Sequence, residues 1–350
     1  MENASAPFDL QALVRPNIRS LHPYSSARDE FTGQAEIYLD ANENPFDSGF
    51  NRYPDPLARQ VKALLAREKG VTPEQIALGN GSDEIIDLIY RIFCRPGVDQ
   101  VITLPPTYGM YRVSADINDV AVKEVPLLPG FQPDTEAILA AVDERTKVLW
   151  LCSPNNPSAN DLEPDKVRAL LAGFPGIVVI DEAYVDFTGR DSYATLLADH
   201  PNLIVMQTFS KAWGLAGIRL GMALASREII SLFNRVKPPY NVNELTQRKA
   251  LEALQQSERM RQEVATIIGQ RTLLQQYLAG LDFVERIYPS DSNFLLVKVN
   301  DPRGVYGYLV ERGVIVRDRS KQYLCEGCLR FTVGTPEENE TLFRTLLEMQ

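Results

Sequence analysis

Short, almost continuously apolar runs alternate with longer amphipathic stretches through the first two thirds of this sequence. Strands that are covered on both faces carry apolar residues at nearly every position, so such runs predict buried strands. Strand–helix alternation is typical of an α/β fold in which helices flank a mostly parallel sheet. The predicted strands are Val101–Leu104, Val148–Cys152, Ile177–Ile180, Leu203–Met206 and Met222–Ala225. The predicted helices are Leu57–Lys69, Ser82–Phe93, Thr135–Val142 and Pro164–Leu171.

The pattern changes after about residue 240. The stretch Glu244–Leu281 has nearly continuous helical spacing, and we expect it to break into two or more helices. Shorter apolar runs follow it and predict a smaller α+β unit. These runs are Asn293–Val299, Val314–Val316 and Leu329–Val333.

These patterns predict a large domain over residues 41–240 and a small domain formed by residues 1–40 and 241–350. The first 40 residues are rich in turn formers. We expect them to pack as an arm on the small domain or on a partner. No internal repeat or low-complexity linker interrupts the chain.

Composition excludes several classes of function. The net charge of −10 argues against broad binding of nucleic acid or anionic membranes, which requires a basic surface. The only histidines are His22 and His200, too few for a three-histidine zinc site. The pair Cys325 and Cys328 lacks a second pair or a nearby histidine, so we expect no metal. Neither a signal peptide nor an apolar run of about 18 residues is visible, which predicts a cytoplasmic protein.

The polar residues that follow the predicted strands are the candidates for function, because open parallel sheets bind ligands at the carboxyl ends of their strands. After a short apolar run, 76–78, the chain reads Gly79-Asn80-Gly81-Ser82-Asp83-Glu84 immediately before a predicted helix. Glycines let the backbone approach an anion, and the first N–H groups of a helix can hold a phosphate. The alternative is an ordinary strand–helix turn that Ser82 caps.

Three other polar residues stand at strand ends. Asn156 precedes a proline, which keeps it extended so that its amide can face a ligand; an ordinary proline turn is the alternative. A buried Asp181 carboxylate needs a cation or hydrogen-bond donors beside it. A protonated ring nitrogen of a ligand would supply the cation; the alternative is that Asp181 caps the start of a helix and accepts from its N–H groups. Lys211 lies in an apolar, glycine-rich segment near Arg219. That setting lowers the pKa of an ammonium group and frees the amine to attack a carbonyl. The alternative, a solvated surface lysine, fits this apolar segment less well.

Taken together, these motifs resemble those of the fold-type I pyridoxal-phosphate enzymes, the aspartate aminotransferase superfamily. The motifs that carry the resemblance are Asn156, Asp181 with Tyr184, Ser210-Lys211 and Arg219, in that order. Further motifs are similar to those of the histidinol-phosphate aminotransferase family. These are Leu39-Asp40-Ala41-Asn42-Glu43-Asn44-Pro45, Arg52-Tyr53-Pro54-Asp55, Pro106-Thr107-Tyr108 and Leu329–Thr335. The resemblance extends from about residue 24 to residue 335.

The resemblance implies that the cofactor is pyridoxal 5'-phosphate. It implies that Lys211 carries the cofactor as an imine and later moves a proton between substrate and cofactor carbons. Asp181 is implied to pair with the pyridine N–H, and Tyr184 with Asn156 to hydrogen-bond the phenolic oxygen of the ring. Tyr108 is implied to stack on the ring. The residues implied to contact the cofactor phosphate are Gly81, Ser82, Asp83, Thr208, Ser210 and Arg219.

The resemblance also implies how substrates and a second subunit take part. Arg330 matches the arginine that binds the 2-oxoacid carboxylate, and Tyr24 and Arg317 match positions that contact a substrate phosphate. Tyr53 matches a tyrosine that reaches the cofactor phosphate from the neighbouring subunit, which implies a homodimer. The implied reaction converts L-histidinol phosphate and 2-oxoglutarate to imidazole acetol phosphate and L-glutamate.

Two positions depart from the family pattern. The usual Asn-Pro-Thr-Gly reads Asn156-Pro157-Ser158-Ala159 here, and alanine adopts a positive φ less readily than glycine. Trp213 stands where smaller or phenyl side chains are more usual, and we expect it to pack in the core. The sequence leaves three other functions open: an aromatic-amino-acid aminotransferase, a phospho-amino-acid decarboxylase, and a cofactor-binding module without turnover.

Overall fold

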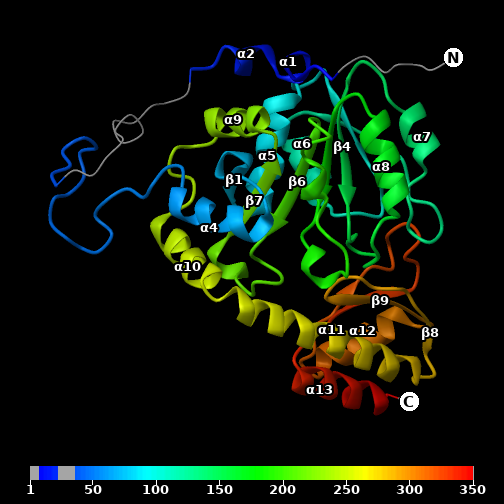
Figure 1. The fold of residues 1–350 in the computed structure, drawn as a ribbon. Helices are drawn as coiled ribbons and strands as arrows, with labels where there is room; N and C mark the ends of the chain where they lie inside the picture. The colour runs from blue at the N-terminus through cyan, green and yellow to red at the C-terminus, as the bar shows by residue number, and fades with distance from the viewer. Residues whose placement is uncertain (1–7, 23–35, 350) are drawn as a thin grey trace.

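The computed structural model describes residues 8–22 and 36–349 and contains two β-sheets, one of seven strands and one of four (Figure 1). The larger sheet has the strand order β1-β7-β6-β5-β4-β2-β3. Its strands are β1 (Ile76–Asn80), β2 (Gln100–Thr103), β3 (Ala121–Glu124), β4 (Thr146–Cys152), β5 (Ile177–Asp181), β6 (Leu203–Thr208) and β7 (Leu220–Ala225). All five strands predicted from the continuous apolar runs are present.

Four neighbouring pairs of the larger sheet run parallel: β2 with β3, β2 with β4, β4 with β5, and β5 with β6. Only β7 is reversed, because it runs antiparallel to both β6 and β1. The predicted α/β fold with a mostly parallel sheet is therefore confirmed. Since the parallel strands end at one edge, the residues that follow β4, β5 and β6 come to the same side of the molecule.

Helices cover both faces of the larger sheet, because side chains alternate between two buried clusters along each central strand. In β5, Val178 and Ile180 belong to one cluster and Ile177 and Val179 to the other. One face packs on α4 (Arg59–Lys69), α7 (Thr135–Ala140), α8 (Pro164–Gly173) and α10 (Glu244–Leu254). The other packs on α5 (Ser82–Phe93), α6 (Met110–Ile117) and α9 (Arg227–Val236). Short 3-10 helices lie at Pro73–Gln75, Val185–Phe187, Tyr193–Leu196 and Ala216–Ile218.

The smaller sheet is antiparallel throughout, in the order β10-β11-β9-β8. Leu278, Leu309 and Leu346 come from the three helices that share its buried cluster. Its elements are α11 (Ser257–Ala279), β8 (Val284–Ile287), β9 (Phe294–Val299), α12 (Pro302–Glu311), β10 (Arg317–Asp318), β11 (Cys328–Thr332) and α13 (Pro336–Leu347). The long helical stretch after residue 240 is confirmed as two helices, α10 and α11. Within the described ranges, no helix has the length and hydropathy that crossing a membrane requires.

Three strands differ from the sequence prediction, and one of them, β8, forms where the sequence predicts no strand. The strand β3 is not expected from the sequence, because its four residues at the sheet edge are exposed or half-buried and lack a continuous apolar run. The apolar run Val314–Val316 does not form a strand. The strand β10 begins immediately after it, at Arg317, where pairing with Arg330 of β11 starts.

Residues 8–22 of the N-terminal arm pack on the larger sheet's helices, whereas the sequence predicts that the arm packs on the small domain or on a partner. These residues contain α1 (Leu10–Leu13) and α2 (Pro16–Arg19). The Arg15 N–H donates to the Ile92 carbonyl oxygen of α5 at 3.0 Å, and Arg235 of α9 donates to the Arg19 carbonyl oxygen at 3.1 Å. Val14 and Ile18 are buried in the same cluster as α5 and α9. The division near residue 240 itself stays a prediction.

Candidate active site

A cavity of about 400 Å³ lies at the ends of β4, β5 and β6 and extends to β10 and β11. It brings together most of the residues singled out from the sequence. These are Ser82, Asp83, Tyr108, Asn156, Asp181, Tyr184, Thr208, Ser210, Lys211, Arg219, Arg317 and Arg330. Gly81 precedes the first of them at the start of α5. Tyr53 does not line this cavity, and Tyr24 lies outside the described residues.

Asp181 is the last residue of β5, and its carboxylate is buried at the base of the cavity. Tyr111 of α6 donates a 2.7 Å hydrogen bond to one carboxylate oxygen, and the Ala183 N–H donates to the other at 3.1 Å. Burial nevertheless raises the pKa of Asp181 to about 6. Among the described residues, no lysine or arginine forms a salt bridge with this carboxylate. A buried carboxylate in this setting favours a cationic ligand beside it.

Lys211 lies in the turn that follows β6, half-buried, with its Nζ 5.5 Å from the centre of the Tyr184 ring. The turn is closed by a 3.0 Å hydrogen bond from the Gly214 N–H to the Lys211 carbonyl oxygen. Burial lowers the pKa of Lys211, and the charge of Arg330 lowers it further, while Asp181 opposes both. A desolvated amine of this kind is a better base and nucleophile than a surface lysine.

The start of α5 forms an anion-binding corner of the cavity. Gly81 is the N-cap at φ 77°, and no side chain caps the helix, so its first N–H groups remain to bind an anion. The alternative that Ser82 caps the helix is wrong, because Ser82 is already the first helical residue. A Cβ on Gly81 would lie 2.5 Å from an Arg219 Nη atom. Glycine is favoured here chiefly because other residues rarely adopt φ 77°, and a side chain would also push this guanidinium aside.

Hydroxyl and guanidinium groups surround that helix start. Arg219, held at φ 51°, places one Nη atom 3.3 Å from Asp83 and the other 3.5 Å from the Ser210 hydroxyl. The Thr208 and Ser210 hydroxyls lie 3.1 Å apart. Tyr108 donates to Asp83 at 3.1 Å. This corner combines a cation, two hydroxyls and a helix N-terminus. Such a combination is suited to bind a phosphate group.

The opposite side of the cavity carries an ordered chain of polar groups. An Nη atom of Arg330 donates to Asn156 Oδ1 at 2.6 Å. The Asn156 amide nitrogen in turn lies 3.5 Å from the Tyr184 hydroxyl. Burial lowers the pKa of Arg330, and burial raises the pKa of Tyr184 well above its ordinary value. The Tyr184 phenol therefore stays protonated at neutral pH and can donate to a ligand oxygen.

Sequence reasoning missed two polar residues of this site. Tyr111 contacts Asp181 from α6, and its ring stacks on Trp150 of β4 with centroids 4.7 Å apart. Arg319 lines the cavity beside Arg317 and Arg330. No signal for Arg319 is present in the sequence, because the predicted run Val314–Val316 ends before it and Arg319 reaches the cavity wall through the pairing of β10 with β11.

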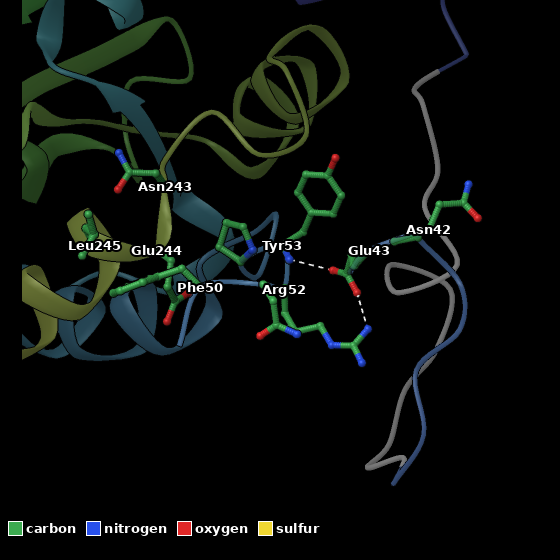
Figure 2. Close-up of a pocket in the computed structure, with 11 residues that line it drawn as sticks. Asn42, Glu43, Phe50, Arg52, Tyr53, Asn243, Glu244 and Leu245 are labelled. Carbon is green, nitrogen blue, oxygen red and sulfur yellow. Dashed lines mark hydrogen bonds and ion pairs between the residues drawn. The ribbon is translucent and has the colours of Figure 1, made fainter. Parts of the chain in front are cut away.

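Tyr53 lies in a second pocket, of about 470 Å³, between the segment 41–54 and the start of α10. Its ring stacks on Tyr240 with centroids 4.5 Å apart, and its N–H donates to Glu43 at 2.7 Å. Figure 2 shows that Glu43 also accepts from Arg52, at 2.7 Å. Apolar side chains at this pocket remain open to solvent, and Leu245 is 63% exposed.

The structure also places the residues at which the sequence departs from the family pattern. Ala159 adopts φ 72°, so the loop keeps the left-handed turn without glycine, and its side chain is buried. Trp213 is buried with its ring 5.0 Å from that of Phe209, which confirms that it packs in the core. Cys325 and Cys328 are free, buried thiols.

The fold and this cavity define a class of protein. The family model for aminotransferase class I and II matches residues 34–346, and the chain belongs to this family. A histidinol-phosphate aminotransferase from Flavobacterium johnsoniae is 53% identical over 342 residues, which cover 97% of this chain and 98% of that protein. One from Parabacteroides distasonis is also 53% identical, with 98% and 99% covered. Within the class, the chain falls among the histidinol-phosphate aminotransferases.

Solved structures agree with this assignment. The histidinol-phosphate aminotransferase from Sinorhizobium meliloti, in complex with pyridoxal-5'-phosphate, superposes with a TM-score of 0.77 at 25% identity. The alignment covers 85% of this chain and 84% of that one. The L-threonine-O-3-phosphate decarboxylase from Porphyromonas gingivalis has a TM-score of 0.72 at 23% identity, a likeness that shows the fold alone. The fold-type I architecture expected from the sequence is therefore confirmed.

Proposed function

We propose that this protein transfers an amino group between L-histidinol phosphate and 2-oxoglutarate, giving imidazole acetol phosphate and L-glutamate. The observation that carries the proposal is that the Asp181 carboxylate and the Lys211 amine line the same cavity. The carboxylate is buried without a salt bridge from a described lysine or arginine, and the amine has a lowered pKa. Class I and II aminotransferases depend on pyridoxal phosphate, whose ring nitrogen and aldehyde suit these two groups.

The residues of the cavity fit that cofactor from end to end. The uncapped start of α5, the Ser210 and Thr208 hydroxyls and Arg219 would hold its phosphate. Asp181 would hold the ring nitrogen protonated. When bound, the cofactor supplies a ring that withdraws electrons and stabilises negative charge on the substrate carbon. Tyr108 would cover the ring, while Tyr184 and Asn156 would hydrogen-bond its phenolic oxygen.

Lys211 is proposed as both the anchor for the cofactor and the group that moves protons. Burial favours the neutral amine, so Lys211 Nζ can accept a proton from the substrate carbon and return it to a neighbouring carbon. Tyr111 fixes the Asp181 carboxylate during this transfer through its 2.7 Å hydrogen bond. The Asp181 carboxylate therefore needs no reorganisation, because its hydrogen bonds from Tyr111 and the Ala183 N–H are already made in the free protein.

The arginine side of the cavity is proposed to bind both amino substrates in turn. Arg330 is held in place by Asn156, so its guanidinium can grip a carboxylate with little loss of side-chain freedom. Arg317 lies opposite Arg330 across the β10–β11 pair, and we propose that it binds the substrate phosphate together with Tyr24. Guanidinium groups donate hydrogen bonds to both carboxylates and phosphates. A site that must bind two different substrates in turn requires this property.

The direct test is to assay purified protein for L-glutamate formation from L-histidinol phosphate and 2-oxoglutarate. We expect turnover that requires both substrates and added pyridoxal phosphate, with L-phenylalanine a much poorer amino donor. Carbon dioxide is measured in parallel with L-threonine phosphate and no oxoacid. Preference for phenylalanine would point to an aromatic aminotransferase, and carbon dioxide release to a decarboxylase; either result would reject the proposal.

We also propose a homodimer in which Tyr53 of one subunit reaches the cofactor phosphate of the other. Two observations support it: Tyr53 is absent from the lining of its own subunit's cavity, and its pocket has exposed apolar side chains. The test mixes inactive Lys211→Ala subunits with weakened Tyr53→Phe subunits. If Tyr53 acts across the interface, each hybrid dimer regains one intact site. Mixtures no more active than the separate variants would place Tyr53 elsewhere.

A further inference from the structure

The β10–β11 hairpin places three arginines on one wall of the cavity. Arg317 and Arg330 are direct partners in this antiparallel pair. Arg319 follows two residues after Arg317, and its N–H continues the pairing by donating to the Cys328 carbonyl oxygen at 2.9 Å. Alternate residues of a strand share a face, so Arg317 and Arg319 point the same way. All three guanidinium-bearing residues line the cavity.

This wall lacks the negative charges that would normally balance it. Among the described residues, Arg219 pairs with Asp83 at 3.3 Å, but none of the three hairpin arginines forms a salt bridge. The carboxylate within the hairpin, Asp318, accepts from the Ser320 N–H at 2.8 Å instead. Like charges directly across a strand pair repel one another. The positive charge of this wall therefore favours an anionic ligand.

Arg319 combines a buried N–H that lacks an acceptor with the absence, among the described residues, of any side-chain hydrogen bond. Its Nε is buried and has no hydrogen-bond partner, and the same holds for the Nε of Arg330. Arg330, however, already donates to Asn156 at 2.6 Å. Burial, reinforced by the charges of Arg330 and Arg317, lowers the pKa of Arg319 to about 10. Arg319 is thus still a cation at neutral pH, and a buried N–H without an acceptor favours a ligand that supplies one.

We propose that Arg319 binds the phosphate group of the substrate together with Arg317 and sets the preference of the site for phosphate esters. This inference rests on the proposed function and deepens it. A phosphate monoester carries about two negative charges and three acceptor oxygens near neutral pH, so it can engage two guanidinium groups at once. A carboxylate carries one charge and two oxygens. Arg330 and Arg317 suffice for the two carboxylates of glutamate, and Arg319 supplies the additional donor that phosphate uses.

The test compares the two half-reactions of the holoenzyme, each followed by the absorbance of the cofactor in a single turnover. Arg319→Gln removes the charge and keeps much of the side-chain volume. We expect its apparent Kd for L-histidinol phosphate to rise by about 10- to 100-fold, the range for a lost charged hydrogen bond, while the Kd for L-glutamate changes by less than about threefold. Arg319→Lys should fall between, because it keeps the charge without the planar fork.

The matched control is Lys321→Gln, which removes a positive charge two residues away from an exposed side chain outside the cavity. It should leave both constants unchanged, which separates direct contact from general electrostatics. An equal rise in both constants for Arg319→Gln, or no rise in either, would overturn the role of Arg319. Circular dichroism and the behaviour of Arg319→Lys show whether a loss reflects misfolding, since the lysine variant keeps the cation.

Failure of the proposed function would be seen separately, as absence of turnover of L-histidinol phosphate by the unsubstituted holoenzyme. In that case inorganic phosphate is tested as a competitive inhibitor of the L-glutamate half-reaction. The inference then predicts an inhibition constant at least about tenfold weaker in Arg319→Gln than in the parent protein. Equal inhibition constants in the two proteins would end the assignment of Arg319 as a phosphate-binding residue.

Discussion

The hydrogen bond from Tyr111 to Asp181 offers a quantitative test of how the site keeps a buried carboxylate ionised. Tyr111→Phe removes only the hydroxyl and leaves the ring stacked on Trp150, where the ring planes differ by 14°. A hydrogen bond to a charged group contributes about 1.5–3 kcal/mol. About 1.4 kcal/mol corresponds to one pKa unit, so losing this bond moves the pKa of Asp181 from about 6 to about 7–8.

The direction of the pH effect follows from which form of Asp181 is useful. Only the ionised carboxylate can pair with a protonated ring nitrogen, so activity falls as the pH drops through the pKa of Asp181. The bound cation lowers this pKa in parent and variant alike, and the displacement between the two curves remains. The acid limb of kcat/KM against pH should therefore move about one to two pH units upward in Tyr111→Phe. The variant should approach the parent's activity near pH 9.

Tyr90→Phe provides the matched control. The Tyr90 hydroxyl is buried and donates to the Tyr111 carbonyl oxygen at 2.7 Å, so its loss also removes a buried hydrogen bond from the same aromatic cluster. It does not touch Asp181, and it should reduce thermal stability without moving the acid limb. Coinciding acid limbs for Tyr111→Phe and the parent protein would refute the reasoning, whatever happens to stability.

Two further substitutions test the anion-binding corner at the start of α5. Arg219→Gln should raise the dissociation constant of pyridoxal phosphate about 10- to 100-fold, measured by equilibrium dialysis, while kcat at saturating cofactor changes by only a few-fold. An unchanged dissociation constant would contradict the role given to Arg219. Gly221→Ala would place a Cβ against the Ser82 nitrogen, so it should destabilise the apoprotein by about 1–3 kcal/mol and weaken cofactor binding. A urea midpoint equal to that of the parent would show that this close approach is not required.

The sequence predicts the larger sheet well because its strands are buried on both faces. Apolar residues then occupy consecutive positions, as in Ile177–Ile180, and the pattern needs no knowledge of neighbours. The pattern fails where burial is partial. The edge strand β3 includes Lys123 and Glu124, and β10 has only two residues, Arg317 and Asp318. Such strands exist because a partner strand offers hydrogen bonds, which no local pattern reports.

The sequence predicts the site residues that are placed by the ends of strands. It does not predict those that are placed by contacts between distant parts of the chain. Asn156 and Lys211 follow buried strands and Asp181 ends one, so their convergence follows from parallel topology. Tyr111 lies on a helix, and its contact with Asp181 joins residues 70 positions apart. Arg319 acquires its place only through the register of β10 with β11. The position of the N-terminal arm also depends on tertiary contacts, because Val14 is buried against α5 and α9.

The most direct test of the whole account is to find which lysine carries the cofactor. The holoenzyme is reduced with borohydride, digested, and analysed by peptide mass spectrometry. We expect the cofactor mass on Lys211 alone, and we expect Lys211→Ala to bind the cofactor reversibly and show no turnover. Lys62 is the natural internal comparison, because burial also lowers its pKa, to about 8, but it lies outside the cavity. Label on Lys62, or turnover by Lys211→Ala near the parent rate, would contradict the account.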